Sequence, residues 1–126
     1  PARLGTVYSF ADARRLVQRV GEARAADLLF SGRTVDAAEA LSIGLVDRVV
    51  PDEELHGAVE AYVTGLCRLS QLSLRNQKAI LREIAAGNAA ETPRARELFD
   101  EAFASEDFRE GYNAFLEKRR PSFPYR

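Results

Sequence analysis

Apolar residues recur at helical spacing along most of the chain, and capping residues, glycines and prolines separate the runs. The pattern predicts helices over about residues 9–20 and 23–30. Asp36 and Glu39 have the spacing of a capping box, which predicts a third helix ending near Gly44. Further helices are predicted at residues 52–69, 73–86, 92–104 and 105–120. The helix over residues 52–69 is expected to bury a stripe made of Leu55, Val59, Tyr62, Val63 and Leu66.

One segment is typical of a β-strand. Residues 45–50, with the sequence LVDRVV, are short, rich in β-branched side chains and bounded by Gly44 and Pro51. The pattern therefore predicts a mainly α chain with one short strand.

Composition narrows the class of protein. The chain has 126 residues, 46% of them hydrophobic and 29% charged, which is typical of a folded globular domain. Its formal net charge of −1, with cations and anions interspersed, argues against a nucleic-acid partner. Cys67 is the single cysteine, so a reducing cytoplasm is the expected location. No apolar run reaches the roughly 20 residues of a membrane span, and we expect neither a membrane partner nor a signal peptide.

Two further sequence features bear on what this chain can do. It begins at Pro1 and contains no Met, so we expect it to be a fragment. His56 is the only histidine and lacks nearby residues with metal-ligand spacing, so no metal site is predicted.

The segment SEDFREGYNAFLEKRRPSF, residues 105–123, combines a helix start, an aromatic face and a basic end. Ser105 is a good N-cap, and the acidic residues after it complement the helix dipole. The apolar face consists of Phe108, Tyr112, Phe115 and Leu116, and the basic end of Lys118, Arg119 and Arg120. Pro121 is expected to stop the helix.

The order E-G-x-x-A-F-x-E-K-R within this segment closely resembles the C-terminal signature of the crotonase superfamily, the enoyl-CoA hydratase/isomerase family. In that family the segment is the last helix of a trimerising helical region. Its Phe and Lys lie near the CoA nucleotide of a bound acyl-CoA, and these positions fall on Phe115 and Lys118. The resemblance implies a CoA-thioester substrate, an enolate intermediate and no metal or redox cofactor, because the CoA is part of the substrate.

The resemblance extends over essentially all of the chain but only the C-terminal half of a typical family member. Residues 20–33 resemble the pattern V-G-x-x-x-A…L-L-x-T-G, and residues 36–50 continue it. We therefore expect the C-terminal helical region of a crotonase-like fold, without the N-terminal β-spiral core. Residues 1–50 would be a remnant of the core and residues 51–126 a helical oligomerisation region. Because the family's oxyanion hole belongs to the other half, we expect this chain alone to be inactive.

The start of the chain, PARLGTVY, is where the acyl-end chemistry is expected. In hydratases of the family this motif begins P-E, and the glutamate is an acid/base. Here Pro1 or Ala2 occupies that position, and neither side chain can transfer a proton. The form P-x-x-L-G-x-x-Y instead resembles methylmalonyl-CoA decarboxylase, a crotonase relative whose tyrosine hydroxyl interacts with the substrate carboxylate. That tyrosine falls on Tyr8, which could otherwise be a packing residue.

Asp12 is the second candidate at the acyl end. It could act as an acid/base if an apolar pocket raised its pKa. An Asp in a first turn more often serves the helix dipole, and Arg15 is close enough to pair with it, so the structural interpretation of Asp12 is favoured.

Three functions remain open on the sequence. The first is an acyl-CoA enzyme of the enoyl-CoA hydratase/isomerase family, and the second is a decarboxylase of a carboxylated acyl-CoA. The third is a non-catalytic helical interaction module. In every case we expect a homo-oligomer formed through the C-terminal helices, whose apolar faces would otherwise remain exposed.

Overall fold

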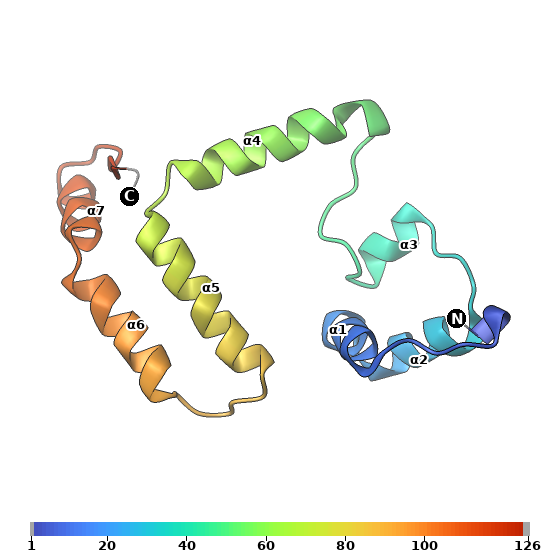
Figure 1. Ribbon diagram of the computed structural model, residues 1–126. Helices are drawn as coiled ribbons and strands as arrows, with labels where there is room; N and C mark the ends of the chain where they lie inside the picture. The colour runs from blue at the N-terminus through green and yellow to red at the C-terminus, as the bar shows by residue number, and fades with distance from the viewer. Residues whose placement is uncertain (1, 125–126) are drawn as a thin grey trace. The chain divides into compact units, whose positions relative to one another are not determined.

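The computed structural model describes residues 2–124, and these residues form helices and connecting loops without a β-strand (Figure 1). The helices are η1 (Ala2–Leu4), α1 (Phe10–Val20), α2 (Glu22–Ser31), α3 (Ala37–Ser42), η2 (Asp52–Glu54), α4 (Leu55–Cys67), α5 (Gln71–Ala85), α6 (Pro93–Ala104) and α7 (Glu106–Leu116). The prediction of a mainly α chain is confirmed. The described part contains no helix with the length and apolar character needed to cross a bilayer.

The chain divides into two compact units, Pro1–Glu54 and Leu55–Arg126, called here the N-terminal unit and the C-terminal unit. The expected roles of residues 1–50 as a core remnant and of residues 51–126 as an oligomerisation region stay predictions.

Helices α1, α3, α6 and α7 of the described part each begin within one residue of the predicted helix start. Ser9, Asp36, Thr92 and Ser105 each accept a hydrogen bond, through the side chain, from the N–H three residues later. Such a bond satisfies one of the N–H groups that a helix start leaves without an intrahelical partner. These caps depend only on neighbouring residues, which is why their positions can be read from the sequence.

Helix α5 begins at Gln71, two residues before the predicted range of 73–86. Its N-cap is Ser70, whose Oγ accepts a hydrogen bond from the N–H of Ser73 at 3.1 Å. The same Oγ donates to Asp107 Oδ2 at 2.5 Å. Ser70 therefore both starts α5 and connects it to the first turn of α7.

The predicted strand at residues 45–50 is wrong, because this segment consists of bends and irregular backbone. The N–H of Leu45 donates to the carbonyl of Ala40 at 2.8 Å, which closes the end of α3. The Leu45 carbonyl accepts from Arg19 Nε at 3.3 Å. A strand requires a neighbouring strand to bond its N–H and C=O groups, and the described residues provide none.

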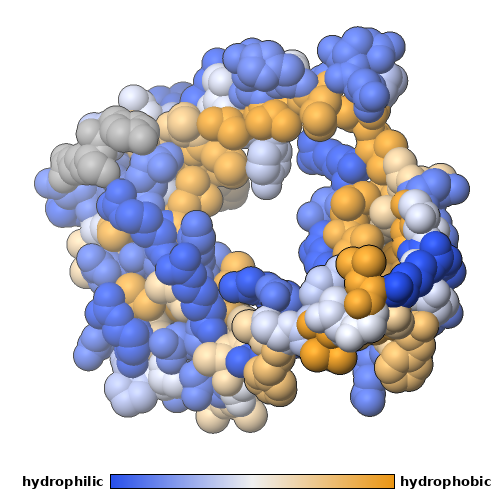
Figure 2. Space-filling model, turned by 45° about the vertical axis from the view of Figure 1, so that its right-hand side comes forward, coloured by the Kyte–Doolittle hydropathy of each residue, from blue (hydrophilic) through white to orange (hydrophobic). Residues whose placement is uncertain are grey.

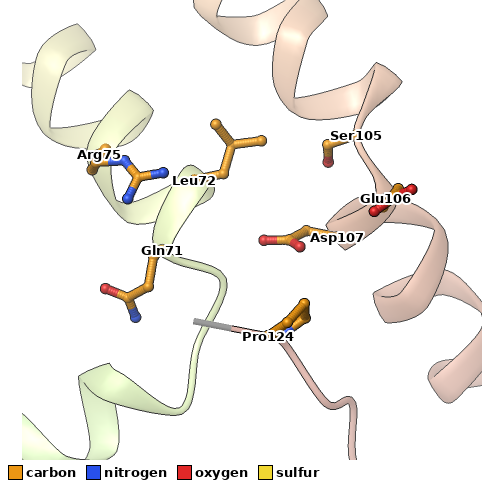
Figure 3. Close-up of a pocket in the computed structure, with 7 residues that line it drawn as sticks. All are labelled: Gln71, Leu72, Arg75, Ser105, Glu106, Asp107 and Pro124. Carbon is orange, nitrogen blue, oxygen red and sulfur yellow. The ribbon is translucent and has the colours of Figure 1, made fainter. Parts of the chain in front are cut away.

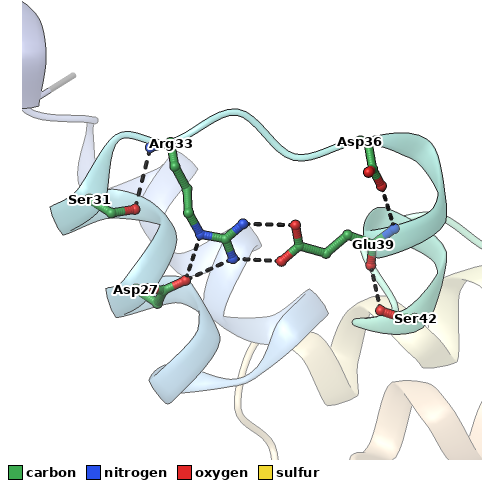
Figure 4. Close-up of polar contacts among 6 residues, drawn as sticks. All are labelled: Asp27, Ser31, Arg33, Asp36, Glu39 and Ser42. Carbon is green, nitrogen blue, oxygen red and sulfur yellow. Dashed lines mark hydrogen bonds and ion pairs between the residues drawn. The ribbon is translucent and has the colours of Figure 1, made fainter.

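In the N-terminal unit, α1 packs on α2, with Val20 and Ala25 buried. Arg33, in the loop between α2 and α3, connects the two helices (Figure 4). Its guanidinium donates to Asp27 Oδ2 at 2.8 Å and to both carboxylate oxygens of Glu39 at 2.6 and 2.7 Å. The Glu39 side chain thus reaches Arg33, whereas a full capping box would direct it to the N–H of Asp36.

In the C-terminal unit, α5 packs on α6 and α6 on α7. Leu98 is 3% exposed and Asn76 7% exposed. Asn76 Nδ2 donates to the Leu98 carbonyl at 2.9 Å and to Glu101 Oε2 at 3.0 Å, so a polar residue holds α5 to α6. The apolar pattern of α5 does not reveal this buried asparagine.

Several apolar faces in the described part of the chain are exposed. The predicted buried stripe of α4 is wrong for Leu55, Val59, Tyr62 and Val63, which are exposed. Within the described part of the C-terminal unit, no other helix packs closely over α4. Figure 2 shows hydrophobic surface along this helix. Cys67, at the end of α4, is exposed as well.

A second exposed apolar feature is a row of aromatic rings along α6 and α7. It consists of Phe99, Phe103, Phe108 and Tyr112, with successive ring centroids 4.5, 4.9 and 6.4 Å apart. Each ring is about half exposed.

Candidate functional site

The candidate CoA-contacting residues lie where α7 ends. The helix stops at Leu116, one turn before Pro121, because the backbone of Lys118 turns into the left-handed region at φ = 54°. The N–H of Lys118 donates to the Phe115 carbonyl at 3.3 Å, and that of Arg119 to the Ala114 carbonyl at 3.0 Å. These two bonds form a Schellman C-cap, which usually places a glycine where this chain has Lys118. The prediction that the helix continues to Pro121 is therefore wrong.

This cap brings the two predicted CoA-contacting residues into one turn. Phe115 is 80% exposed, and Lys118, three residues later, is exposed as well. Within residues 2–124 the Lys118 ammonium has no carboxylate partner. An exposed ring and a cation in the same turn are suited to an aromatic base that carries phosphates.

The neighbouring cation, Arg119, is engaged with two carboxylates. Its Nη1 and Nη2 donate to the two carboxylate oxygens of Glu110, at 2.6 and 2.9 Å, and its Nε donates to Glu117. Glu110 also accepts the backbone N–H of Ser122 at 2.7 Å. The Arg119 bonds, followed by the Ser122 N–H, lower the pKa of Glu110 to about 2, and the carboxylates raise the pKa of Arg119 above its ordinary value.

The predicted acyl-end residues, Tyr8 and Asp12, lie at the start of α1. Tyr8 is 54% exposed, two residues before the helix begins. Asp12 Oδ2 accepts from the hydroxyl of Ser9 at 2.7 Å, and Asp12 Oδ1 accepts from Arg15 Nη1 at 3.2 Å. These contacts fit the structural interpretation of Asp12, and its catalytic role stays a prediction. Pro1 lies outside the described residues.

The two predicted pairs of site residues belong to different units. Tyr8 and Asp12 are in the N-terminal unit, and Phe115 and Lys118 are in the C-terminal unit. The described residues contain no group of His, Cys, Asp and Glu arranged to hold a metal ion. His56 is exposed and pairs with Glu60 at 3.2 Å.

A separate cleft lies between the starts of α5 and α7 (Figure 3). It is lined by Gln71, Leu72, Arg75, Ser105, Glu106, Asp107 and Pro124. Its volume is about 140 Å³, below the roughly 300 Å³ at which ligand pockets begin. We assign it no cofactor.

The comparison with known proteins decides the family. The family model described as enoyl-CoA hydratase/isomerase matches residues 1–126. This chain belongs to the enoyl-CoA hydratase/isomerase family. The crotonase resemblance carried by residues 105–123 and by the motifs before them is thereby confirmed.

Individual relatives agree with this family. A probable enoyl-CoA hydratase of Mycobacterium tuberculosis is 40% identical over 125 residues, which are 98% of this chain and 49% of the relative. The methylmalonyl-CoA decarboxylase of Escherichia coli is 29% identical over 126 residues, covering 98% of this chain and 48% of the relative. The crystal structure of an enoyl-CoA hydratase/isomerase family protein from Hyphomonas neptunium matches with a TM-score of 0.91 and 44% identity, over 100% of this chain and 48% of that one.

The chain thus spans about half the length of the family members that it matches. Its helices correspond to the helical region of the crotonase fold, as the sequence predicts. Sequence reasoning missed Glu110 as part of the candidate site. Its signal is a glutamate nine residues before an arginine, a spacing that an uninterrupted helix would not bring together.

Proposed function

We propose that this chain is the C-terminal part of an acyl-CoA enzyme that acts on a CoA thioester through a stabilised enolate. The observation that carries the proposal is that Phe115 and Lys118 are both exposed and lie in one turn. The chain that contains them matches the enoyl-CoA hydratase/isomerase family over its whole length. Lys118 would contact the phosphates or the adenine of CoA, and Phe115 would provide an apolar wall for the base. The reaction needs no metal or redox cofactor under this proposal.

The chain alone should lack turnover. Enolate stabilisation needs preorganised N–H donors at the thioester oxygen, and such donors commonly supply the largest catalytic term. In the proposal these donors belong to the half of the family fold that this chain does not span. The protein is proposed to act in the cytoplasm.

A second candidate reaction is decarboxylation of a carboxylated acyl-CoA. It is favoured by the pattern P-x-x-L-G-x-x-Y and by the methylmalonyl-CoA decarboxylase among the relatives. The Tyr8 hydroxyl would bind the substrate carboxylate. The C–C bond would then break with release of CO₂, leave its electron pair in the enolate, and allow protonation by Asp12 or water.

The C-terminal helices are proposed to form the contacts of a homo-oligomer. The row Phe99, Phe103, Phe108 and Tyr112 offers an aromatic surface for a second copy. The same surface would serve a non-catalytic interaction module. Light scattering over a range of concentrations should show a dimer or larger assembly, and a monomer at every concentration would contradict this part of the proposal.

Turnover assays test the reaction. The 126-residue chain should be inactive on crotonyl-CoA and methylmalonyl-CoA. The same chain, joined to the N-terminal half of the Hyphomonas neptunium relative, should be active on one of them. Tyr8→Phe in the joined protein should lower decarboxylation by tenfold or more and leave hydration unchanged, because only decarboxylation uses the hydroxyl.

The controls separate the three functions. Arg14→Gln is a matched change at an exposed position of α1 outside the proposed site. Equal rates for Tyr8→Phe and the unchanged protein on both substrates would remove Tyr8 from the mechanism. Inactivity of the joined protein, together with no binding of either thioester, would favour the interaction module. Robust turnover by the 126-residue chain alone would show that the active site is complete without the other half.

A further inference from the structure

The backbone after α7 folds back along its own helix and is held there by one side chain. Glu110, on α7, accepts two hydrogen bonds from Arg119 and a third from the N–H of Ser122. These partners lie nine and twelve residues further along the chain. A single carboxylate thus fixes both the side chain that follows the Lys118 turn and the backbone beyond it.

A second contact, made by Phe123, also holds the backbone after α7 against that helix. Phe123 is half-buried, and its Cζ would lie 3.9 Å from a Cβ placed on Gly111 of α7. The ring therefore lies over the glycine at ordinary van der Waals distance. Glu110 and Gly111 are adjacent, so the returning segment meets α7 at neighbouring positions through a polar and an apolar contact.

Lys118 is the residue that most needs this support. It is the only non-glycine residue with positive φ among residues 2–124. The left-handed conformation brings Cβ close to the following carbonyl oxygen, and such strain persists only where the surroundings hold it. Arg119, the next residue, is bound by Glu110 on one side and by Glu117 on the other.

We propose that Glu110 is a positioning residue, which holds the Lys118 turn so that the lysine ammonium and the Phe115 ring face the CoA nucleotide together. The inference rests on the proposed function for its ligand and on the geometry of the turn for its mechanism. Glu117 differs because its carboxylate accepts only from the Arg119 side chain within the described residues, whereas the Glu110 carboxylate also accepts the backbone N–H of Ser122. Glu110 acts through Lys118 and does not itself contact the substrate.

Hydrogen exchange in the 126-residue chain tests the positioning role without a ligand. In Glu110→Gln, the N–H groups of Lys118 and Arg119 should exchange about tenfold faster or more, because the ion pair that holds the turn is lost. The N–H of Leu98, in the buried part of α6, should keep its rate and so report that the fold is intact. Glu97→Gln, which removes an exposed carboxylate paired with Arg94 at 3.1 Å, is the matched control.

Two outcomes would overturn the positioning role. One is unchanged exchange at Lys118 and Arg119 in Glu110→Gln. The other is an equal acceleration at Leu98, which would show loss of overall stability and no specific effect on the turn. Either result counts against the inference whether or not the chain binds CoA.

CoA binding tests whether Glu110 positions the Lys118 turn for contact with CoA. NMR titration with CoA up to millimolar concentration should shift the amide signals of Phe115 and Lys118. Glu110→Gln and Lys118→Ala should each weaken CoA binding by about tenfold, and the double variant should be no weaker than Lys118→Ala. The matched control is Lys78→Ala, since Lys78 is the other lysine of the chain and is exposed on α5.

The two failures are distinguishable. Losses that multiply in the double variant would show that Glu110 acts independently of Lys118, and would overturn the inference while leaving the CoA site in place. Absence of any CoA-dependent shift would contradict the proposed function of the turn, and the exchange rates would still decide whether Glu110 holds it.

Discussion

The two units of the chain are stabilised by polar contacts of different kinds. In the C-terminal unit, buried side chains carry hydrogen bonds between helices: Asn76 joins α5 to α6, and Ser70 joins α5 to α7. In the N-terminal unit, the buried residues within the described part are apolar, and polar contacts between helices run through exposed arginines such as Arg33. Burial decides what each contact is worth, because an exposed ion pair competes with water and a buried hydrogen bond does not.

This difference predicts where substitutions are most damaging. In the C-terminal unit, removal of a buried polar side chain such as Asn76 leaves its partners with one hydrogen bond fewer. In the N-terminal unit, water can replace the lost partner. The candidate CoA turn belongs to the C-terminal unit, yet its own contacts through Glu110 and Arg119 are exposed ones. We therefore expect that substitutions in this turn can alter its conformation without unfolding the helices beside it.

The largest effect is expected at Asn76. Asn76→Ala removes two donated hydrogen bonds and leaves the Leu98 carbonyl and the Glu101 carboxylate with one partner fewer, so unfolding free energy should fall by about 2 kcal/mol. Urea denaturation followed by circular dichroism measures it. Gln77→Ala, at the next and exposed position, should change stability by less than about 0.5 kcal/mol. Equal effects of the two substitutions would remove the distinction between the two kinds of contact.

The features that sequence reasoning predicted are the local ones. A cap such as Thr92 needs only the residues that follow it, and the end of α1 needs only Gly21, whose φ of 82° suits glycine. The strand at residues 45–50 and the buried stripe of α4 failed because both depend on partners from elsewhere in a fold. Among the described residues those partners are absent.

The residues of the candidate CoA site could be predicted from the sequence, but the turn that brings them together could not. The family signature points to Phe115 and Lys118, whereas helix rules predict a helix up to Pro121. A left-handed lysine leaves no signature in the sequence, since glycine or asparagine is the usual residue at such a cap. The contact of Glu110 with Arg119 exists only because the helix ends early, so no periodic pattern reveals it.

A smaller effect, of opposite sign, is expected at Lys118. Lys118→Gly relieves the left-handed strain and should raise unfolding free energy by about 1 kcal/mol, while it removes the cation proposed to contact CoA. Urea denaturation should therefore show a higher stability of Lys118→Gly, and CoA titration should show weaker binding. The matched control is Glu117→Gly, at φ = −80°, which should not stabilise the chain because its backbone is already in the ordinary right-handed region. Loss of stability in Lys118→Gly would show that the turn is not strained.

The smallest effect is expected in acid, where the guanidinium–carboxylate contacts of the two units can be compared through the pKa values of Glu110 and Glu39. Bonds from Arg119 and then the Ser122 N–H lower the pKa of Glu110 to about 2, and bonds from Arg33 lower the pKa of Glu39. Since an unfolded glutamate has a pKa of about 4.3, the stability that Glu110 contributes is fully present above that pH and is lost as the pH falls toward 2. Carboxyl ¹³C NMR should show Glu110 ionised at pH 3 in the unchanged chain. In Arg119→Gln the midpoint of Glu110 should rise toward 4.3, whereas Arg33→Gln should raise the midpoint of Glu39 and leave that of Glu110 unchanged. A Glu110 midpoint unaffected by Arg119→Gln would mean that the guanidinium does not hold this carboxylate in solution, and would separate the Lys118 turn from its proposed support.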